Sequence, residues 1–417
     1  MNQNSFLQRK NQSTNSINNS KEEDNLEKIK EREKNINNEE STEKETENES
    51  INIKNSEKPK ISKRNLEHFD SNINIKYLRE LCNNSENIGY NDLIEVYNLK
   101  NDLSSAFVAI KNNESQLVDI YEMTSIENAK KIVSLKGHFD KLTGVRYFLD
   151  IYRGKEYLLT LDRGNTVIIW EIKDKLNYIK IRKLESDCQP GKNIIYSCLI
   201  FFTKDNKYIL TTKFCFGKVY SRLLKFDTGK LIYGLKFTER NKTRHIIEWK
   251  DVINNKLYVI ECCFNCKVII YNPLEQKIYD EIEINGDNIC ACIVKAPDKK
   301  SDYLCINSCV EETSIVIYNL QEKNIIDTIK IKSMLYQMVP WNDRYLLVAD
   351  KTNRSFDIFD IYQKKIIFIA KGRHNKAVKC AKKIKLNDNE LILTCGIDSR
   401  VQLWLNNNKS IKIKKPY

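Results

Sequence analysis

Short apolar runs separated by polar turns cover most of the chain from about Asn72 onward. Runs such as FVAIK, VIIW and LILTC are alternating or continuous in their apolar positions, which is typical of β-strands buried on one or both faces. The segments between them are rich in Asn, Asp, Lys and Gly, which favour turns. This texture recurs every 40 to 50 residues or so, a spacing that predicts small repeated sheets of about four strands each. A turn or two of helix is expected only near Ile75–Cys82.

The first 65 residues have a different composition. Charged and polar tracts such as KEEDNLEKIKEREKN and EESTEKETENES dominate them, and aromatic residues are almost absent. Such a segment cannot bury enough apolar surface to offset the entropy lost on ordering. We therefore predict a disordered tail over residues 1–65, a linker or closing segment over residues 66–89, and a folded domain over residues 90–417.

The most informative repeat runs from Gly372 to Trp404. Its His is followed at the fourth and seventh positions by Val378 and Ala381, then by the strand LILTCG, an Asp-Ser turn and the strand RVQLW. This order of residues resembles one WD40 repeat, the unit of a β-propeller blade. The resemblance implies a buried hydrogen-bond network among His374, Thr394, Asp398 and Trp404.

A second repeat has most of the same features. It begins at Gly137-His138, has apolar Leu142 and Val145 at the same two offsets, and continues through YLLTLDRGNTVIIWEI. Its turn position is Gly164 where the family has Asp, and Asp162 lies two residues earlier. The residues that the resemblance places in the network of this repeat are His138, Thr160 and Trp170.

The remaining repeats retain the pattern without the full motif. Aromatic residues replace the Trp of the third strand, namely Phe226, Tyr271, Tyr318 and Phe359. Together the repeats predict an all-β, seven-bladed propeller of the WD40 type, with blades near 90–136, 137–185, 186–237, 238–284, 285–332, 333–371 and 372–417.

Closing the ring of blades would remove the exposed sheet edges that invite aggregation. The C-terminal KSIKIKKPY is expected to supply the outer strand of the seventh blade. A further strand must come from the other end of the chain, and both Asn72–Leu81 and Leu93–Leu99 are candidates.

The net charge of +13 falls on the residues after the tail, because the tail is balanced. A basic domain can contact nucleic acid, anionic membrane or acidic proteins. Heavy use of Asn, Lys and Ile along the whole chain, as an A/T-rich coding sequence produces, explains the excess equally well. The N-terminus lacks the apolar core of a secretory signal, and IIYSCLIFF is too short to span a bilayer. We therefore predict an intracellular protein, cytoplasmic or nuclear.

Catalytic and metal sites find little support in the sequence. His374, Thr394 and Asp398 have the residue types of a hydrolase triad, but no strand-to-helix elbow or oxyanion loop surrounds them. Cys262, Cys263 and Cys266 could form half of a zinc site, yet no second CxxC occurs. The thirteen cysteines lie mostly in strand-like runs and are expected to be reduced core thiols. We predict neither enzyme activity nor a metal or cofactor.

The resemblance to WD40 propellers implies a scaffold that binds proteins or peptides and helps assemble a multiprotein complex. In that family, loops at one end of the central channel form a ring of side chains for a partner. Alignment to the residue before the turn position predicts that this ring contains Arg163, Phe264, Glu311, Thr352 and Ile397. The alternative function is association with RNA or a ribonucleoprotein through the basic surface.

Overall fold

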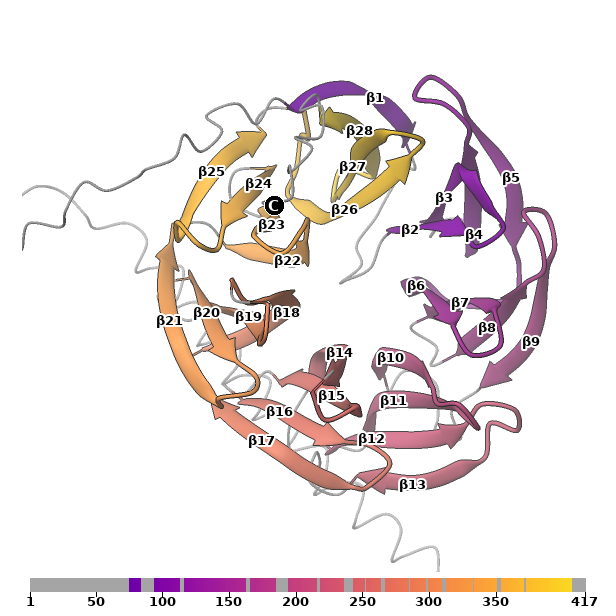
Figure 1. Ribbon diagram of the computed structural model, residues 1–417. Helices are drawn as coiled ribbons and strands as arrows, with labels where there is room; N and C mark the ends of the chain where they lie inside the picture. The colour runs from indigo at the N-terminus through magenta and orange to yellow at the C-terminus, as the bar shows by residue number, and fades with distance from the viewer. Residues whose placement is uncertain are drawn as a thin grey trace, which may run out of the picture. The chain divides into compact units, whose positions relative to one another are not determined.

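The chain folds into seven four-stranded antiparallel sheets, which confirms the predicted propeller. The computed structural model describes residues 75–83, 94–112, 116–162, 166–184, 194–215, 218–235, 243–251, 253–263, 267–284, 286–297, 299–309, 313–332, 334–350, 354–370 and 373–406. The predicted tail lies outside these residues. Figure 1 shows the sheets arranged in a ring around a common axis, with one strand of each sheet innermost.

The first three blades follow the chain from the innermost to the outermost strand. Their strands are β2 (Ile94–Leu99), β3 (Asp102–Asn112), β4 (Leu117–Met123) and β5 (Ala129–Leu135) in blade 1; β6 (Leu142–Asp150), β7 (Lys155–Asp162), β8 (Val167–Ile172) and β9 (Tyr178–Leu184) in blade 2; and β10 (Ile194–Phe202), β11 (Lys207–Cys215), β12 (Lys218–Lys225) and β13 (Leu231–Leu235) in blade 3.

The next three blades repeat this order, and blade 7 differs at its outer edge. The strands are β14 (Thr243–Asp251), β15 (Lys256–Cys263), β16 (Lys267–Asn272) and β17 (Lys277–Glu283) in blade 4; β18 (Asp287–Lys295), β19 (Asp302–Cys309), β20 (Thr313–Asn319) and β21 (Asn324–Ile331) in blade 5; β22 (Leu335–Pro340), β23 (Tyr345–Asp350), β24 (Ser355–Asp360) and β25 (Lys365–Ala370) in blade 6; and β26 (Val378–Leu386), β27 (Asn389–Gly396), β28 (Arg400–Asn406) and β1 (Ile75–Asn83) in blade 7.

Strand β1 closes the ring. It pairs antiparallel with β28, from Ile75 opposite Asn406 to Asn83 opposite Arg400, and it lies beside β28 at the outer edge of blade 7 in Figure 1. The prediction that KSIKIKKPY would supply this strand is therefore wrong, because β1 occupies the free edge of β28. Of the two candidate closing segments, the one near Asn72–Leu81 supplies the strand.

The helical turn expected near Ile75–Cys82 is also wrong, and the register of β1 explains why. Pairing shifts between Tyr77 and Arg79 and again between Glu80 and Cys82. Each irregularity inserts a residue and breaks the alternation of a strand. Apolar residues then occur at helix-like spacing, although Leu78 and Leu81 pack on the blade 1 side of the strand, while Tyr77 packs on the blade 6 side.

The hydrophobic core is divided into clusters that lie between neighbouring blades. One cluster joins blades 7 and 1 through residues such as Leu393 and Val108, and another joins blades 6 and 7 through Ala349 and Trp404. Corresponding clusters lie at the other blade boundaries. Both faces of each sheet are therefore buried, which explains why many strands are apolar at every position instead of alternating.

The antiparallel order of each blade places equivalent turns at the same end of the channel. Turns between the first and second strands of the blades, called inner turns below, gather at one end. Turns between the second and third strands gather at the opposite end, together with the connections that enter each new blade. The molecule therefore presents two rims, each formed by a different set of turns.

Candidate functional site

The four predicted network residues of blade 7 lie within hydrogen-bond distance of one another. His374 Nδ1 lies 3.0 Å from Asp398 Oδ1, and His374 Nε2 lies 2.9 Å from Thr394 Oγ1. The indole N–H of Trp404 donates to the same Thr394 oxygen at 2.9 Å. Since an ionised carboxylate only accepts, the Nδ1–H of His374 donates to Asp398.

Blade 2 holds the same kind of network, with its carboxylate at a different position from the one the motif indicates. His138 Nε2 lies 2.7 Å from Thr160 Oγ1, and Trp170 Nε1 donates to Thr160 at 3.0 Å. The carboxylate is supplied by Asp162, whose Oδ2 lies 2.8 Å from His138 Nδ1. Asp162 is the last residue of β7, so it meets the imidazole from the strand end; in blade 7 the equivalent Asp lies inside the turn.

These networks are suited to structural support. The side chains of Thr160 and Thr394 belong to fully buried residues, so a substrate has no path to either hydroxyl. Burial alone would raise the pKa of Asp398, but the hydrogen bond and charge interaction with His374, together with hydrogen bonds from the N–H groups of Asn375 and Arg400, outweigh it and lower that pKa. The carboxylate is thus held ionised as a fixed acceptor.

A third buried network, in blade 4, was not predicted. Glu261 is completely buried and accepts hydrogen bonds from Ser221 Oγ at 2.6 Å, from Thr243 Oγ1 at 2.9 Å and from the Tyr271 hydroxyl. Burial raises the pKa of Glu261 although the three hydroxyl donors act to lower it. Ser221 belongs to β12, so this carboxylate also joins blades 3 and 4.

The spacing within this network is a signal that the sequence contains. Tyr271 follows Glu261 by ten residues, as Trp170 follows Thr160 and Trp404 follows Thr394. Glu261 and Tyr271 therefore occupy the Thr and Trp positions of the motif. A search that allowed a carboxylate and a phenol at these positions would have found them.

The inner strands enclose a cavity of about 330 Å³ in the central channel. Apolar residues supply much of its lining, and polar side chains line it from different blades, namely Glu95, Arg146, His245, Glu248, Gln337 and Lys382. A volume of this size is at the lower end of the range for small-molecule sites. What the cavity can bind depends on whether its polar side chains already form hydrogen bonds or ion pairs within the protein.

Five of these polar groups connect one blade with another, whereas Glu248 pairs with Lys250 of its own strand at 3.1 Å. Arg146 of blade 2 donates through Nη1 to the carbonyl oxygens of Cys198 in blade 3 (3.3 Å) and Ile246 in blade 4 (3.1 Å). Lys382 of blade 7 pairs with Glu95 of blade 1 at 3.5 Å. The cavity lining thus holds the ring together, and a ligand there would have to displace these contacts.

Two further contacts of this kind continue around the channel. The N–H of Ala291 in blade 5 donates to His245 Nδ1 of blade 4 at 3.3 Å. The N–H of Ala381 in blade 7 donates to Gln337 Oε1 of blade 6 at 3.1 Å. The Nδ1 atom of His245 therefore accepts a hydrogen bond from a backbone amide, and the partner in this contact is not a nucleophilic side chain.

The predicted partner-binding ring is described at one position. Ile397 lies in the turn between β27 and β28, is half-buried, and donates its N–H to the carbonyl of Ala377 at 2.9 Å. Its place is at the channel end where the second-to-third-strand turns gather. The other predicted positions lie outside the described residues, namely Arg163, Phe264, Glu311 and Thr352.

The cysteines that resembled half a zinc site are placed in the core where they are described. Cys262 and Cys263 are completely buried, and burial raises the pKa of the Cys262 thiol well above its usual range. Cys266 lies outside the described residues. Among the residues that the structure covers, no group of three or more His, Cys, Asp and Glu is placed to hold a metal ion.

Comparison with known proteins finds relatives in structure alone. No protein-family model and no curated protein matches the chain. Sqt1 from Saccharomyces cerevisiae is 9% identical with a TM-score of 0.55, over 77% of this chain and 99% of that one. BBS1N, solved in complex with ARL6DN, is 10% identical with a TM-score of 0.57, over 77% of this chain and 94% of that one. A second structure of the same complex gives 9% identity and a TM-score of 0.58, over 80% and 98%.

At identities this low, the structural matches show a shared fold alone. In the described part of the chain, no helix has the length and apolar character needed to cross a membrane.

Proposed function

We propose that this chain, a divergent propeller of the WD40 type, is a non-catalytic scaffold that binds protein or peptide partners and helps assemble a multiprotein complex. The observation that carries the proposal is that polar side chains lining the channel form contacts between blades. Arg146, His245, Gln337 and Lys382 all contact other blades. The ring is thereby stiffened, and its turns are left as the surfaces open to a partner.

Two further considerations support this function. The Thr hydroxyls that could have acted as nucleophiles are buried and accept hydrogen bonds from Trp indoles. A propeller of the same fold, BBS1N, is solved in complex with ARL6DN, so the fold is used for protein binding elsewhere. A stiff platform loses little conformational entropy on binding, which favours affinity.

The predicted ring gives the proposal a testable surface. We expect charge-changing variants at the ring, such as Arg163→Glu, Glu311→Lys and Ile397→Glu, to abolish capture of partners by the full chain. Affinity purification from native lysate is the measurement, with thermal unfolding to show that each variant is folded. Partners that bind every ring variant as they bind the wild type would refute the assignment of this face.

The same purification tests the alternative function in RNA or ribonucleoprotein association. One half of the lysate is treated with nuclease, and both halves are washed at two salt concentrations. A protein set that survives nuclease and salt supports the scaffold. Binding through phosphates falls steeply with salt, so recovery that disappears under either treatment would favour the alternative.

A further inference from the structure

Two inner turns, in blades 2 and 4, share one construction. The first runs from Asp150 to Lys155 and the second from Asp251 to Lys256, and each closes a pair of antiparallel strands. In both, the leading Asp is buried, with exposed fractions of 0% and 1%. In both, the residue before the Lys has a left-handed backbone, with φ of 64° at Gly154 and 50° at Asn255.

The buried Asp fixes the backbone of each turn. Asp150 Oδ1 accepts the N–H groups of Tyr152 and Arg153, both at 3.2 Å. Asp251 Oδ1 accepts the N–H of Ile253 at 3.0 Å. Asp251 Oδ2 also accepts the side-chain amide of Asn254 at 2.6 Å. A carboxylate that accepts two N–H groups of its own turn reduces the number of conformations open to that turn. Side chains at the tips of both turns therefore project in defined directions.

These fixed tips expose large apolar side chains at the same position. Tyr152 and Ile253 are third in their turns and are 50% and 66% exposed, and Ile151 beside Tyr152 is 60% exposed. In the other inner turns the described tips are mainly polar, for example Lys100-Asn101, Lys204-Asp205, Asn342-Asp343 and Asn387-Asp388. A single exposed apolar residue needs no explanation. Exposure of a large apolar side chain at the same position in two matched turns does need an explanation.

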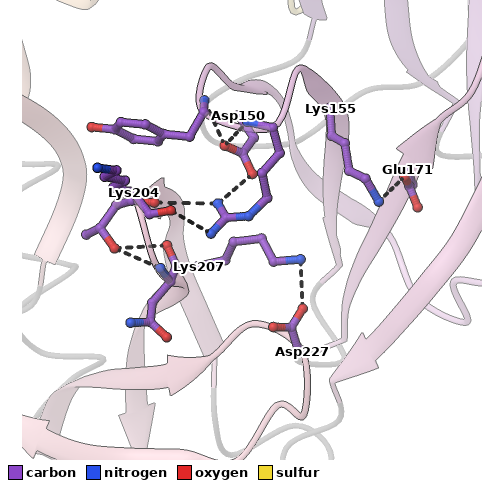
Figure 2. A network of polar contacts seen from close by, with 10 residues as sticks. Asp150, Lys155, Glu171, Lys204, Lys207 and Asp227 are labelled. Carbon is purple, nitrogen blue, oxygen red and sulfur yellow. Dashed lines mark hydrogen bonds and ion pairs between the residues drawn. The ribbon is translucent and has the colours of Figure 1, made fainter.

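The turn of blade 3 lies between the two apolar tips and is tied to the first of them. Arg153 donates through Nη1 to Asp150 Oδ2 at 3.0 Å and through Nη2 to the carbonyl of Lys204 at 3.1 Å. Figure 2 shows Asp150 and Lys204 joined through this network. The backbone of Lys204 is thus held beside the blade 2 tip, and its side chain is exposed.

Charge is distributed unevenly over the same rim. Exposed lysines occur in the inner turns of blades 1, 3 and 5, at Lys100, Lys204 and Lys299, the last two on either side of the Ile253 tip, and one exposed carboxylate, Asp205, follows Lys204. The inner turns of blades 6 and 7 instead expose the carboxylates of Asp343 and Asp388. The rim therefore has an arc with apolar tips and basic flanks, defined here as Ile151, Tyr152, Lys204, Ile253 and Lys299.

We propose that this arc docks a linear segment of a partner protein that carries acidic and apolar side chains together. Its carboxylates would meet Lys204 and Lys299, while its apolar groups would cover Tyr152 and Ile253. A linear segment can follow blades 2 to 5 and avoid Asp343 and Asp388. A flat anionic bilayer would bring those carboxylates against like charge, so a peptide fits the rim better. The inference rests on the proposed function but uses the opposite end of the channel from the predicted ring.

The test selects peptides on the full-length chain from a phage-displayed library of random 16-residue sequences. Peptides enriched in Asp and Glu together with Leu, Ile or Phe are expected. The dissociation constant of a synthetic copy, measured by fluorescence anisotropy, should rise about tenfold or more in Tyr152→Ser/Ile253→Ser and in Lys204→Glu. It should also rise with salt. The controls Ile326→Ser and Lys180→Glu change exposed residues on the outer strands and should leave it unchanged.

Other outcomes overturn the inference. Selected peptides without an acidic excess would do so, as would peptides that bind the arc variants as tightly as the wild type. Flotation with phosphatidylserine–phosphatidylcholine vesicles that carries the wild type but not Lys204→Glu would assign the arc to a membrane surface. If captured partners are lost in the ring variants but bind the arc variants as they bind the wild type, the proposed function stands and the arc inference fails. If peptides bind the arc but no complex is captured from lysate, the arc inference stands and the proposed function fails.

Discussion

The hydroxyl of Tyr271 donates to the carboxylate of Glu261, ten residues earlier on the neighbouring strand of blade 4. Both residues are completely buried. This pair stands where Thr394 and Trp404 stand in blade 7. A carboxylate in the middle of a sheet is normally costly, and here hydroxyl donors satisfy both of its oxygens. The propeller thus stabilises equivalent positions with different chemistry.

The raised pKa of Glu261 predicts a pH dependence of stability. A raised pKa means that the folded state binds the proton more tightly than the unfolded chain. The associated stabilisation is complete below the ordinary carboxyl pKa of 4.5 and is lost as the pH rises through the folded value.

In Glu261→Gln this titration is absent. The free energy of unfolding of the wild type, relative to the variant, should therefore fall from pH 4 toward pH 8. Denaturant titrations of both proteins across that range provide the measurement. A difference between them that does not change with pH would contradict the raised pKa.

Replacement of Trp404 by Ala should lower the free energy of unfolding by roughly 3–5 kcal/mol, the range for a large buried aromatic. Trp404 is 5% exposed and packs edge-on against Tyr77 and Phe356, with ring centroids 5.3 and 5.1 Å away. Denaturant unfolding measures the loss. As a control, Ile326→Ala on an exposed strand position should cost under about 0.5 kcal/mol. A loss below about 1 kcal/mol for Trp404→Ala would show that the indole is not buried in solution.

Asp162→Ala should destabilise the protein by about 1–3 kcal/mol, because two groups lose a buried acceptor. Its Oδ2 lies 2.8 Å from His138 Nδ1, and its Oδ1 accepts the N–H of Thr166 at 2.9 Å. Asp162→Asn retains one acceptor oxygen and should lose less. Equal stability of the wild type and the Ala variant in urea unfolding would mean that blade 2 does not depend on this carboxylate.

Deletion of the chain through Asn83 should expose the edge of β28, which pairs with β1 along its length. An unpaired edge of this kind promotes self-association. We expect a lower melting temperature and concentration-dependent oligomers in light scattering after size exclusion. Deletion of residues 1–65 leaves β1 in place and is the matched control. A shorter chain that stays monomeric with an unchanged melting temperature would show that another segment closes the ring.

Gln276→Gly should stabilise the protein by up to about 1 kcal/mol, because Gln276 adopts φ of 53° in the turn before β17, where a β-carbon is disfavoured. Blade 3 has Gly229 with φ of 69° in the corresponding turn. A β-carbon added at Gly229 would lie 2.7 Å from Leu184 Cδ2. Gly229→Ala should therefore destabilise, and thermal melts of the two variants should shift in opposite directions.

The sequence by itself determined the number of blades and nearly all of their boundaries. Strand formation and turn formation depend on residues close together in the chain, such as the apolar run LILTC and the Asp-Ser turn that follows it. The motif spacing also brought His374 and His138 together with their Thr and Trp partners, because these contacts lie within a single blade.

Only the tertiary structure decided the contacts that join distant segments. The pairing of β1 with β28 connects the two ends of the propeller, Ser221 reaches Glu261 from the preceding blade, and Arg146 reaches two other blades. Such contacts depend on closing the ring, which brings residues tens to hundreds of positions apart into reach. Local patterns carry no information on those partners, and even Asp162 could be assigned only after β7 and β8 were placed.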